Sequence, residues 1–360
     1  MTLRIAAALG LALLAGRAPA ADLAKGTPDL KSAGPLAFGP DGLLLIGDTK
    51  GAAIFAVDTA DRVAKPEAGT LAVEAIDTKI AALLGTTPKL IQINDMAVNP
   101  ASGRAYLSVS RGTGPEATPV IVRVGRGDKL EVVAMENVPF AKAELPNVPA
   151  ATAVDRRGQS TRSESITDIA YVDGRVFVAG LSNEEFSSRL LAIPYPFQAK
   201  AQSTGIEIYH GAHGQVETKS PVRTFAAYSV EGKPYLMAAY TCTPLVRLAV
   251  ADLKAGAKVK GATIAELGNR NKPLDMVVYK KGGKDYILLA NSSRGVMKID
   301  AAGIDSAESI SARVAETAGQ PFETIKDLKG VQQLDRLDET HALILVQGAR
   351  GLSLETIELP

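Results

Sequence analysis

The chain has 360 residues, 46% of them hydrophobic, and its 40 basic and 39 acidic residues leave a formal net charge of +1. Such a balance excludes the strongly basic composition typical of proteins that bind nucleic acid. A single cysteine, Cys242, excludes an internal disulfide. The core must therefore come from apolar packing, in one large all-β domain or in two smaller domains.

The first residues have the pattern of a cleavable signal peptide. Arg4 precedes an apolar run from Ile5 to Leu14, and Ala18-Pro19-Ala20 follows as a small-residue cleavage site. The run is too short to span a bilayer, and no other stretch of 18 apolar residues follows. We expect a signal peptide over residues 1–20 and a periplasmic or secreted protein without a membrane span, beginning near Ala21.

A strand hairpin recurs along the rest of the chain. Asp95 and Tyr106, Thr224 and Tyr235, and Asp275 and Tyr286 are each eleven residues apart, and each second residue opens an apolar strand that runs into a polar turn. Third strands follow at 52–58, 119–124, 189–195, 245–250, 295–300 and 351–357, and weaker fourth strands at 129–135, 205–211 and 262–268. Six such units, with inner strands beginning near Pro35, Asp95, Asp168, Thr224, Asp275 and Gly330, have the period of propeller blades.

The sequence therefore predicts an all-β fold, a six-bladed β-propeller of four-stranded blades forming one domain over residues 21–360. A seventh blade remains possible if residues 60–90 or 136–164 hide a degenerate unit. We expect one helix, within 73–85, and a long surface loop over 141–165. The last unit has only three strands, so we expect residues 22–33 at the N-terminus to complete it and close the ring.

Two stretches carry a resemblance to a known repeat. AVNPASGRAYLSVS at 97–110 resembles the YVTN class of bacterial repeat, part of the YVTN/NHL-like propellers, and YILLANSSRGVMKID at 286–300 fits the continuation of the same pattern. The resemblance implies propeller architecture. It implies no particular activity.

Polar residues recur where the units begin and turn. In a propeller these positions surround the mouth of the central channel, where ligands commonly bind. Asp95, Asp168 and Asp275 precede inner strands, and Arg111 and Asn291 lie in the turns after second strands. The three carboxylates could hold a cation such as Ca²⁺. Alternatively, each caps backbone N–H groups and ties neighbouring blades together, in which case no cofactor is needed.

Histidine is scarce, with three residues in the chain. His210 and His213 lie in IYHGAHGQVET with Glu217 four residues further on, a grouping that could bind a transition metal or exchange protons. The flanking glycines make an ordinary hydrogen-bonded loop the competing interpretation. Cys242 is either a reactive thiol or a small buried side chain. Basic-Gly turns such as Lys50-Gly51 and Arg294-Gly295 could bind an anion, or serve only as hairpin turns.

The sequence contains no nucleophile elbow, phosphate-binding loop or dinucleotide fingerprint. We therefore expect a monomeric binding or scaffold module rather than an enzyme, one that presents its channel face to a protein or small ligand and not to nucleic acid. The alternative is a metal-dependent hydrolase of lactonase type that uses the carboxylates at the channel mouth.

Overall fold

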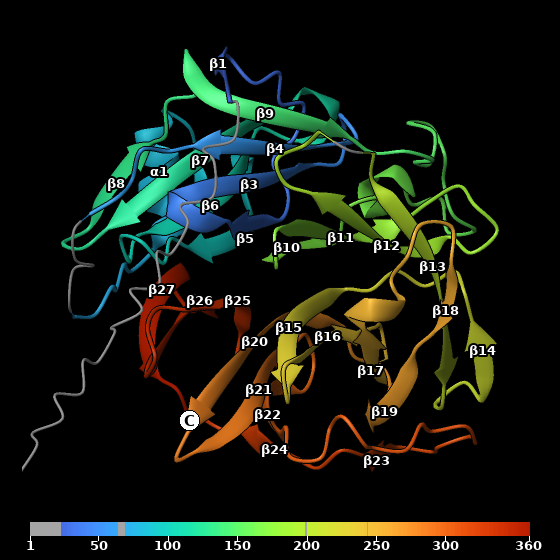
Figure 1. Ribbon diagram of the computed structural model, residues 1–360. Coiled ribbons are helices and arrows are strands. Elements are labelled where there is room, and N and C mark those ends of the chain that lie inside the picture. The colour runs from blue at the N-terminus through green and yellow to red at the C-terminus, as the bar shows by residue number, and fades with distance from the viewer. Residues whose placement is uncertain (1–22, 64–68, 199, 243) are drawn as a thin grey trace, which may run out of the picture.

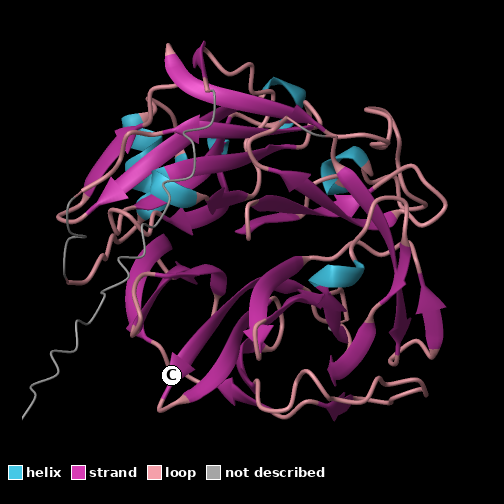
Figure 2. Ribbon diagram, viewed as in Figure 1, coloured by secondary structure: helices cyan, strands magenta, loops and turns pink. Residues whose placement is uncertain are grey.

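The computed structural model describes residues 23–63, 69–198, 200–242 and 244–360. The expected signal peptide lies outside the described residues. Strands dominate, and six small sheets stand around a centre as the blades of a β-propeller (Figures 1 and 2). Among the described residues, no helix combines the length and hydropathy that a membrane crossing requires.

The blades are numbered I to VI by the chain order of their inner strands. Blade I contains β2 (Leu36–Phe38), β3 (Leu43–Asp48), β4 (Ala53–Asp58), β9 (Val138–Glu144) and β1 (Ala24–Gly26). Blade II contains β5 (Ile91–Val98), β6 (Ala105–Arg111), β7 (Thr118–Gly125) and β8 (Lys129–Val132). Blade III contains β10 (Asp168–Val172), β11 (Arg175–Leu181), β12 (Ser188–Pro194), β13 (Gln202–His210) and β14 (Gln215–Glu217), with β18 (Lys258–Lys260) paired to β13.

The remaining blades follow one another along the chain. Blade IV contains β15 (Thr224–Val230), β16 (Lys233–Ala239), β17 (Pro244–Ala249), β19 (Ala262–Leu267) and β23 (Thr317–Gly319). Blade V contains β20 (Pro273–Lys281), β21 (Lys284–Asn291), β22 (Gly295–Asp300) and β24 (Phe322–Ile325), and blade VI contains β25 (Val331–Arg336), β26 (His341–Gly348) and β27 (Gly351–Glu358). The helix α1 (Ile76–Leu83) confirms the predicted one, and short 3-10 turns lie at Pro40–Gly42, Pro88–Leu90, Gly114–Glu116, Arg162–Glu164 and Val250–Asp252.

Hydrophobic clusters fill the spaces between adjacent blades. The strand β3 is buried along its whole length because successive side chains face opposite neighbours. Leu43 and Leu45 pack in the cluster shared with blade III, whereas Leu44 and Ile46 pack in the cluster shared with blade II. This arrangement explains why the strands are continuously apolar rather than alternating.

Blades I and II are exchanged around the ring relative to their order in the chain. The inner strand of blade I contacts the inner strands of blades II and III, and that of blade II contacts blade VI. The ring order is therefore II, I, III, IV, V, VI. After completing blade II, the chain returns through β9 to add an outer strand to blade I, so residues 138–144 are not part of the loop expected over 141–165.

The prediction that residues 22–33 complete the last blade is wrong. The strand β1 pairs with β9 in blade I, far from blade VI (Figure 1). Instead, the chain on its way from blade I to blade II passes along the free edge of β27, where Val73 and Leu354 exchange two backbone hydrogen bonds of 2.9 Å. Because blade II adjoins blade VI, the connecting segment is the part of the chain close enough to cover that edge.

Candidate functional site

The loops that lead into the inner strands meet around a hollow of about 1160 Å³. It is lined from all six blades, by residues that include Pro35, Asn94, Thr167, Arg223, Lys272 and Gln333. Four of these residues immediately precede an inner strand, whereas Asn94 and Gln333 lie within β5 and β25. The lining agrees with the channel mouth that the sequence predicts. The site is therefore assembled from short segments spread over the whole chain.

Basic side chains predominate at this channel mouth. Five basic residues line it against a single acidic one, Glu164; the basic ones are Lys50, Lys89, Arg162, Arg223 and Lys272. Arg223 forms an ion pair with Glu164 and donates through Nε to Thr241 Oγ1 at 3.1 Å. Desolvation at the mouth, together with the Arg223 guanidinium, lowers the pKa of Lys272. The side chains of Lys89 and Lys272 form no ion pair with a described residue.

The three predicted aspartates lie beneath the mouth and join neighbouring blades. Each accepts a hydrogen bond from the inner strand of the next blade in the ring: Asp95 from the Leu36 amide (2.6 Å), Asp168 from Phe225 (2.7 Å) and Asp275 from Leu334 (2.9 Å). The second oxygens of Asp168 and Asp275 accept their own following amides, each at 2.8 Å. The interpretation of these residues as blade caps is confirmed.

A fourth aspartate of the same kind, Asp335, was not predicted. Its carboxylate accepts a hydrogen bond from the Val98 amide at 2.7 Å and so ties blade VI to blade II. It stands five residues after Gly330, where the hairpin spacing places the start of the unit, and pairs with Leu343 in β26. The signal in the sequence is an acidic residue within an otherwise typical inner strand, VQQLDR.

Gln333 connects two of the carboxylates. With its amide nitrogen facing them, it donates to Asp95 Oδ1 at 2.8 Å and to Asp275 Oδ2 at 2.9 Å. Burial raises the pKa of all four aspartates, to about 7 for Asp168 and about 6 for Asp335, and to well above the usual range for Asp95 and Asp275. Mutual repulsion adds to the shifts of Asp95 and Asp275. The ring therefore retains protons near neutral pH.

The Ca²⁺ role of Asp95, Asp168 and Asp275 stays a prediction. Within the described part of the chain, the His, Cys, Asp and Glu side chains placed to share one ion are His210, His213 and Cys242, not the aspartates. Both oxygens of Asp168 and Asp275 accept backbone hydrogen bonds, which account for these carboxylates without a cation.

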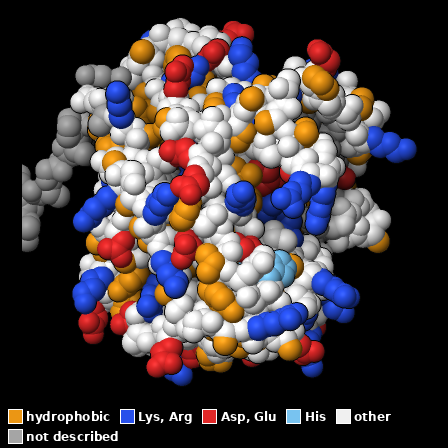
Figure 3. All heavy atoms as spheres, turned by 90° about the vertical axis from the view of Figure 1, so that its right-hand side faces the viewer, with side chains coloured by type: hydrophobic (Ala, Val, Ile, Leu, Met, Phe, Trp, Pro, Cys, Tyr) orange, Lys and Arg blue, Asp and Glu red, His pale blue; other side chains and the backbone are white. Residues whose placement is uncertain are grey.

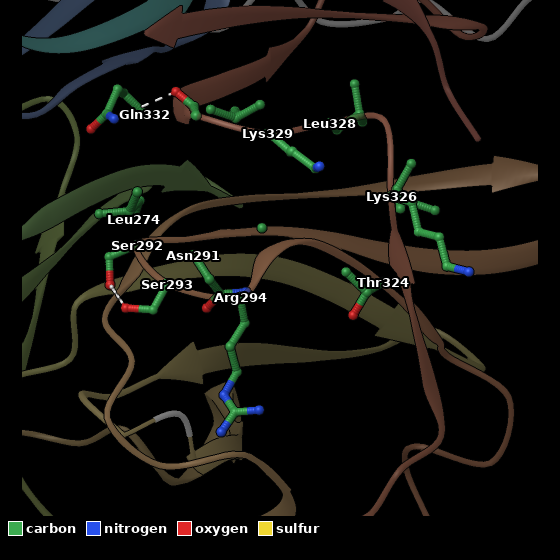
Figure 4. A pocket seen from close by; sticks show the side chains of 14 residues that line it. Leu274, Asn291, Ser292, Ser293, Arg294, Thr324, Lys326, Leu328, Lys329 and Gln332 are labelled. Atoms are coloured by element: carbon green, nitrogen blue, oxygen red, sulfur yellow. Dashed lines mark hydrogen bonds between the residues drawn. The ribbon is translucent and has the colours of Figure 1, made fainter.

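The two predicted turn residues, Asn291 and Arg111, do not line the channel mouth. Asn291 is 5% exposed and lines a second hollow of about 570 Å³ between the turn after β21 and residues 324–332. Figure 4 shows Arg294 and Lys329 coming from opposite walls of this hollow, with Lys326 further along. Arg111 is exposed at the end of β6 and is not among the residues that line the channel mouth.

His210, His213 and Glu217 lie together at the outer edge of blade III. The Oε1 atom of Glu217 is 3.0 Å from His210 Nδ1 and 2.6 Å from His213 Nδ1. The structure adds Cys242, from the turn between β16 and β17 of blade IV. No motif in the sequence connects Cys242 to the histidines, so the sequence alone does not predict that they share a site.

Comparisons with known proteins give similar solved structures but no family. No protein-family model matches it and no curated protein matches it, so the resemblance to the YVTN class stays a prediction. Solved structures similar to it include a putative oxidoreductase (glucose dehydrogenase) from Thermus thermophilus, at 13% identity over 93% of this chain and 99% of that one, with a TM-score of 0.36. Others are a PQQ-bound aldose sugar dehydrogenase from Streptomyces coelicolor (12% identity, 94% and 100% coverage, TM-score 0.35) and a chain of the mitotic checkpoint complex (8%, 98% and 99%, 0.41).

At these identities and TM-scores the likenesses do not bear on function. The class of protein is defined by the sheets themselves, six of them in a ring, which make the chain a six-bladed β-propeller protein.

Proposed function

We propose that this protein is an exported binding module whose channel mouth takes a small anionic ligand, such as a polycarboxylate or a phosphorylated small molecule. The observation that carries the proposal is the excess of basic side chains around the hollow of about 1160 Å³. A concave site with one sign of charge and low-dielectric walls focuses the field and attracts the opposite charge.

The carboxylates below the mouth do not cancel this field. Because burial raises the pKa of Asp168 to about 7 and that of Asp335 to about 6, part of the ring is protonated near neutral pH. Lys89 and Lys272, which form no ion pair with a described residue, remain available to a ligand.

Ligand titration of the purified protein tests this proposal. Citrate and a sugar phosphate should bind and raise the melting temperature, whereas glucose and spermidine should not, and added salt should weaken binding. Lys272→Gln should weaken binding about five-fold, as expected for the loss of about 1 kcal/mol. Lys284→Gln is the matched control, because Lys284 begins β21 at the opposite end of blade V.

Equal binding of glucose and citrate, or equal losses in the two lysine variants, would contradict the proposal. Binding of an acidic protein with no response to the small anions would show that the mouth serves a protein partner instead. The export part of the proposal requires a mature chain beginning near Ala21 and recovered outside the cytoplasm.

A further inference from the structure

The cluster at the edge of blades III and IV has a geometry that the channel does not explain. His210 ends β13, and a turn over residues 211–214 brings His213 back over it, so that the two ring centroids are 3.9 Å apart. Gly214 at φ 68° supplies the left-handed backbone that this tight return needs. One ring nitrogen of each histidine and the Cys242 Sγ all lie within 4.8 Å of one another.

His210 is a buried histidine whose ring nitrogens are not hydrogen-bonded to a described residue. Its side chain is 2% exposed, and within the described part of the chain neither Nδ1 nor Nε2 forms a hydrogen bond, although Glu217 Oε1 lies 3.0 Å from Nδ1. A buried polar atom without a partner destabilises the folded state, and a bound ion is one of the reasons why a native protein keeps such an atom. The adjacent Glu266 is fully buried too, with Oε1 accepting the Gly211 amide at 2.5 Å and Oε2 left without a partner.

Glu217 orients both imidazoles. The carboxylate faces Nδ1 of each ring, which leaves Nε2 of each ring with its lone pair. Carboxylate–histidine pairs of this kind hold metal-binding imidazoles in the required tautomer.

We infer that His210, His213 and Cys242 bind a single borderline-soft transition-metal ion such as Zn²⁺, with Glu217 as the residue that positions both rings. Two imidazole nitrogens and one thiolate suit Zn²⁺ and are poor ligands for Ca²⁺ or Mg²⁺. In a tetrahedral site such ligand atoms lie about 3.5 Å apart. A side-chain adjustment of about 1 Å would close the site, and His213, which is 48% exposed, has room to make it.

The proposed site lies beside the channel mouth but outside its lining. The Cys242 amide donates to the Asn271 carbonyl at 2.7 Å, and the adjacent Thr241 accepts from Arg223, a residue of the mouth. Figure 3 shows the side of the molecule that carries β13, β14 and β18, where histidine side-chain atoms reach the surface among basic and acidic groups. Three protein ligands leave a fourth coordination position for solvent or another donor.

Metal titration of the chelator-treated protein tests the inference. One equivalent of Co²⁺ should bind and produce a sulfur-to-cobalt charge-transfer band in the near ultraviolet, which Zn²⁺ should displace. Cys242→Ser should remove the band, and Cys242→Ser and His213→Ala should each weaken Zn²⁺ binding at least ten-fold. Glu217→Gln should retain the band but weaken binding by 10- to 100-fold, as expected for a positioning residue.

His341→Ala is the matched control, since His341 is an exposed histidine on blade VI that contacts Asp338 and should bind no Zn²⁺. Circular dichroism establishes that each variant is folded. No stoichiometric Co²⁺ binding, or a charge-transfer band that survives Cys242→Ser, would overturn the site. Equal Zn²⁺ affinity in His213→Ala and His341→Ala would do the same.

Discussion

Asp61 illustrates how individual side chains fasten the unusual blade order. Its carboxylate is 1% exposed and accepts from Ser102 Oγ (2.7 Å), Tyr106 Oη (2.9 Å) and Arg104 Nη1 (2.6 Å). Burial would raise the pKa of Asp61, but the two hydroxyl hydrogen bonds and the arginine charges lower it overall. The chain leaving blade I is thereby fastened to the first hairpin of blade II.

Removing this charge should destabilise the fold. Asp61→Asn removes the buried negative charge that Arg104 and Arg123 face and should cost about 3 kcal/mol, measured by urea denaturation at pH 7. Because the folded pKa is lowered, the stabilisation by Asp61 is present above its unfolded pKa of about 3.8 and is lost as pH falls below that value. Asp327→Asn, at an exposed position in a loop, should leave the unfolding midpoint unchanged. Equal midpoints for the two variants would show that the network contributes nothing.

At the scale of elements, the junction between blades VI and II depends on a crossing segment rather than on a strand of its own. Leu71 is 1% exposed in the cluster shared by the two blades, and its backbone exchanges hydrogen bonds with Thr356 Oγ1 at 2.8 and 2.7 Å. The first residues of α1 extend this cover, with Ile76 and Ile80 fully buried.

Leu71→Ala should loosen this junction selectively. Deleting a buried leucine side chain should cost about 2–4 kcal/mol, and amide hydrogen exchange should accelerate in β27 before it does in blades III and IV. Leu83→Ala, at a position 41% exposed on α1, should have little effect on either measurement. Uniform acceleration throughout the ring would indicate that the segment does not protect the edge specifically.

Considered as a whole, the molecule concentrates carboxylates at its centre, where inter-blade caps from blades II, III, V and VI meet. The caps of Asp95 and Asp275 share Gln333, so their substitutions should not be additive. This differs from the independent caps that a repeated sequence position suggests. Stability and charge at the centre are therefore coupled through the ring.

Stability should fall as pH rises through neutrality. The folded pKa of Asp168, about 7, lies above its usual value of 3.8, so its contribution is complete below about pH 3.8 and is lost as pH rises through 7. The part of the free energy of unfolding that Asp168 contributes should decline by about 2–3 kcal/mol between pH 5 and pH 8, and Asp168→Asn should remove that part of the decline. Thermal unfolding across pH measures both.

Adding Ca²⁺ tests the predicted metal role of the same aspartates. Added at pH 8 to chelator-treated protein, it should not change the melting temperature if the carboxylates act only as caps. A stabilisation by Ca²⁺ that disappears in Asp168→Asn would instead establish the predicted metal role.

The local pattern of the sequence determined the six blades, the helix and the place of the channel mouth. Uninterrupted apolar strands such as 43–46 require cover on both faces, and the regular hairpin spacing repeats that requirement around a ring. The aspartates Asp95, Asp168 and Asp275 could be found in the same way, because two of them, Asp95 and Asp275, stand eleven residues before the tyrosine that opens the next apolar strand and Asp168 begins its inner strand.

Only the tertiary structure decided which surfaces meet. The exchange of blades I and II, the cover of β27 by residues 71–75, the capping role of Asp335 and the meeting of Cys242 with His210 all depend on partners distant in the chain. Apolar periodicity specifies that a face must be buried but not against which neighbour, because hydrophobic burial is non-directional. The choice of neighbour follows from packing and backbone hydrogen bonds that form only once the ring has closed.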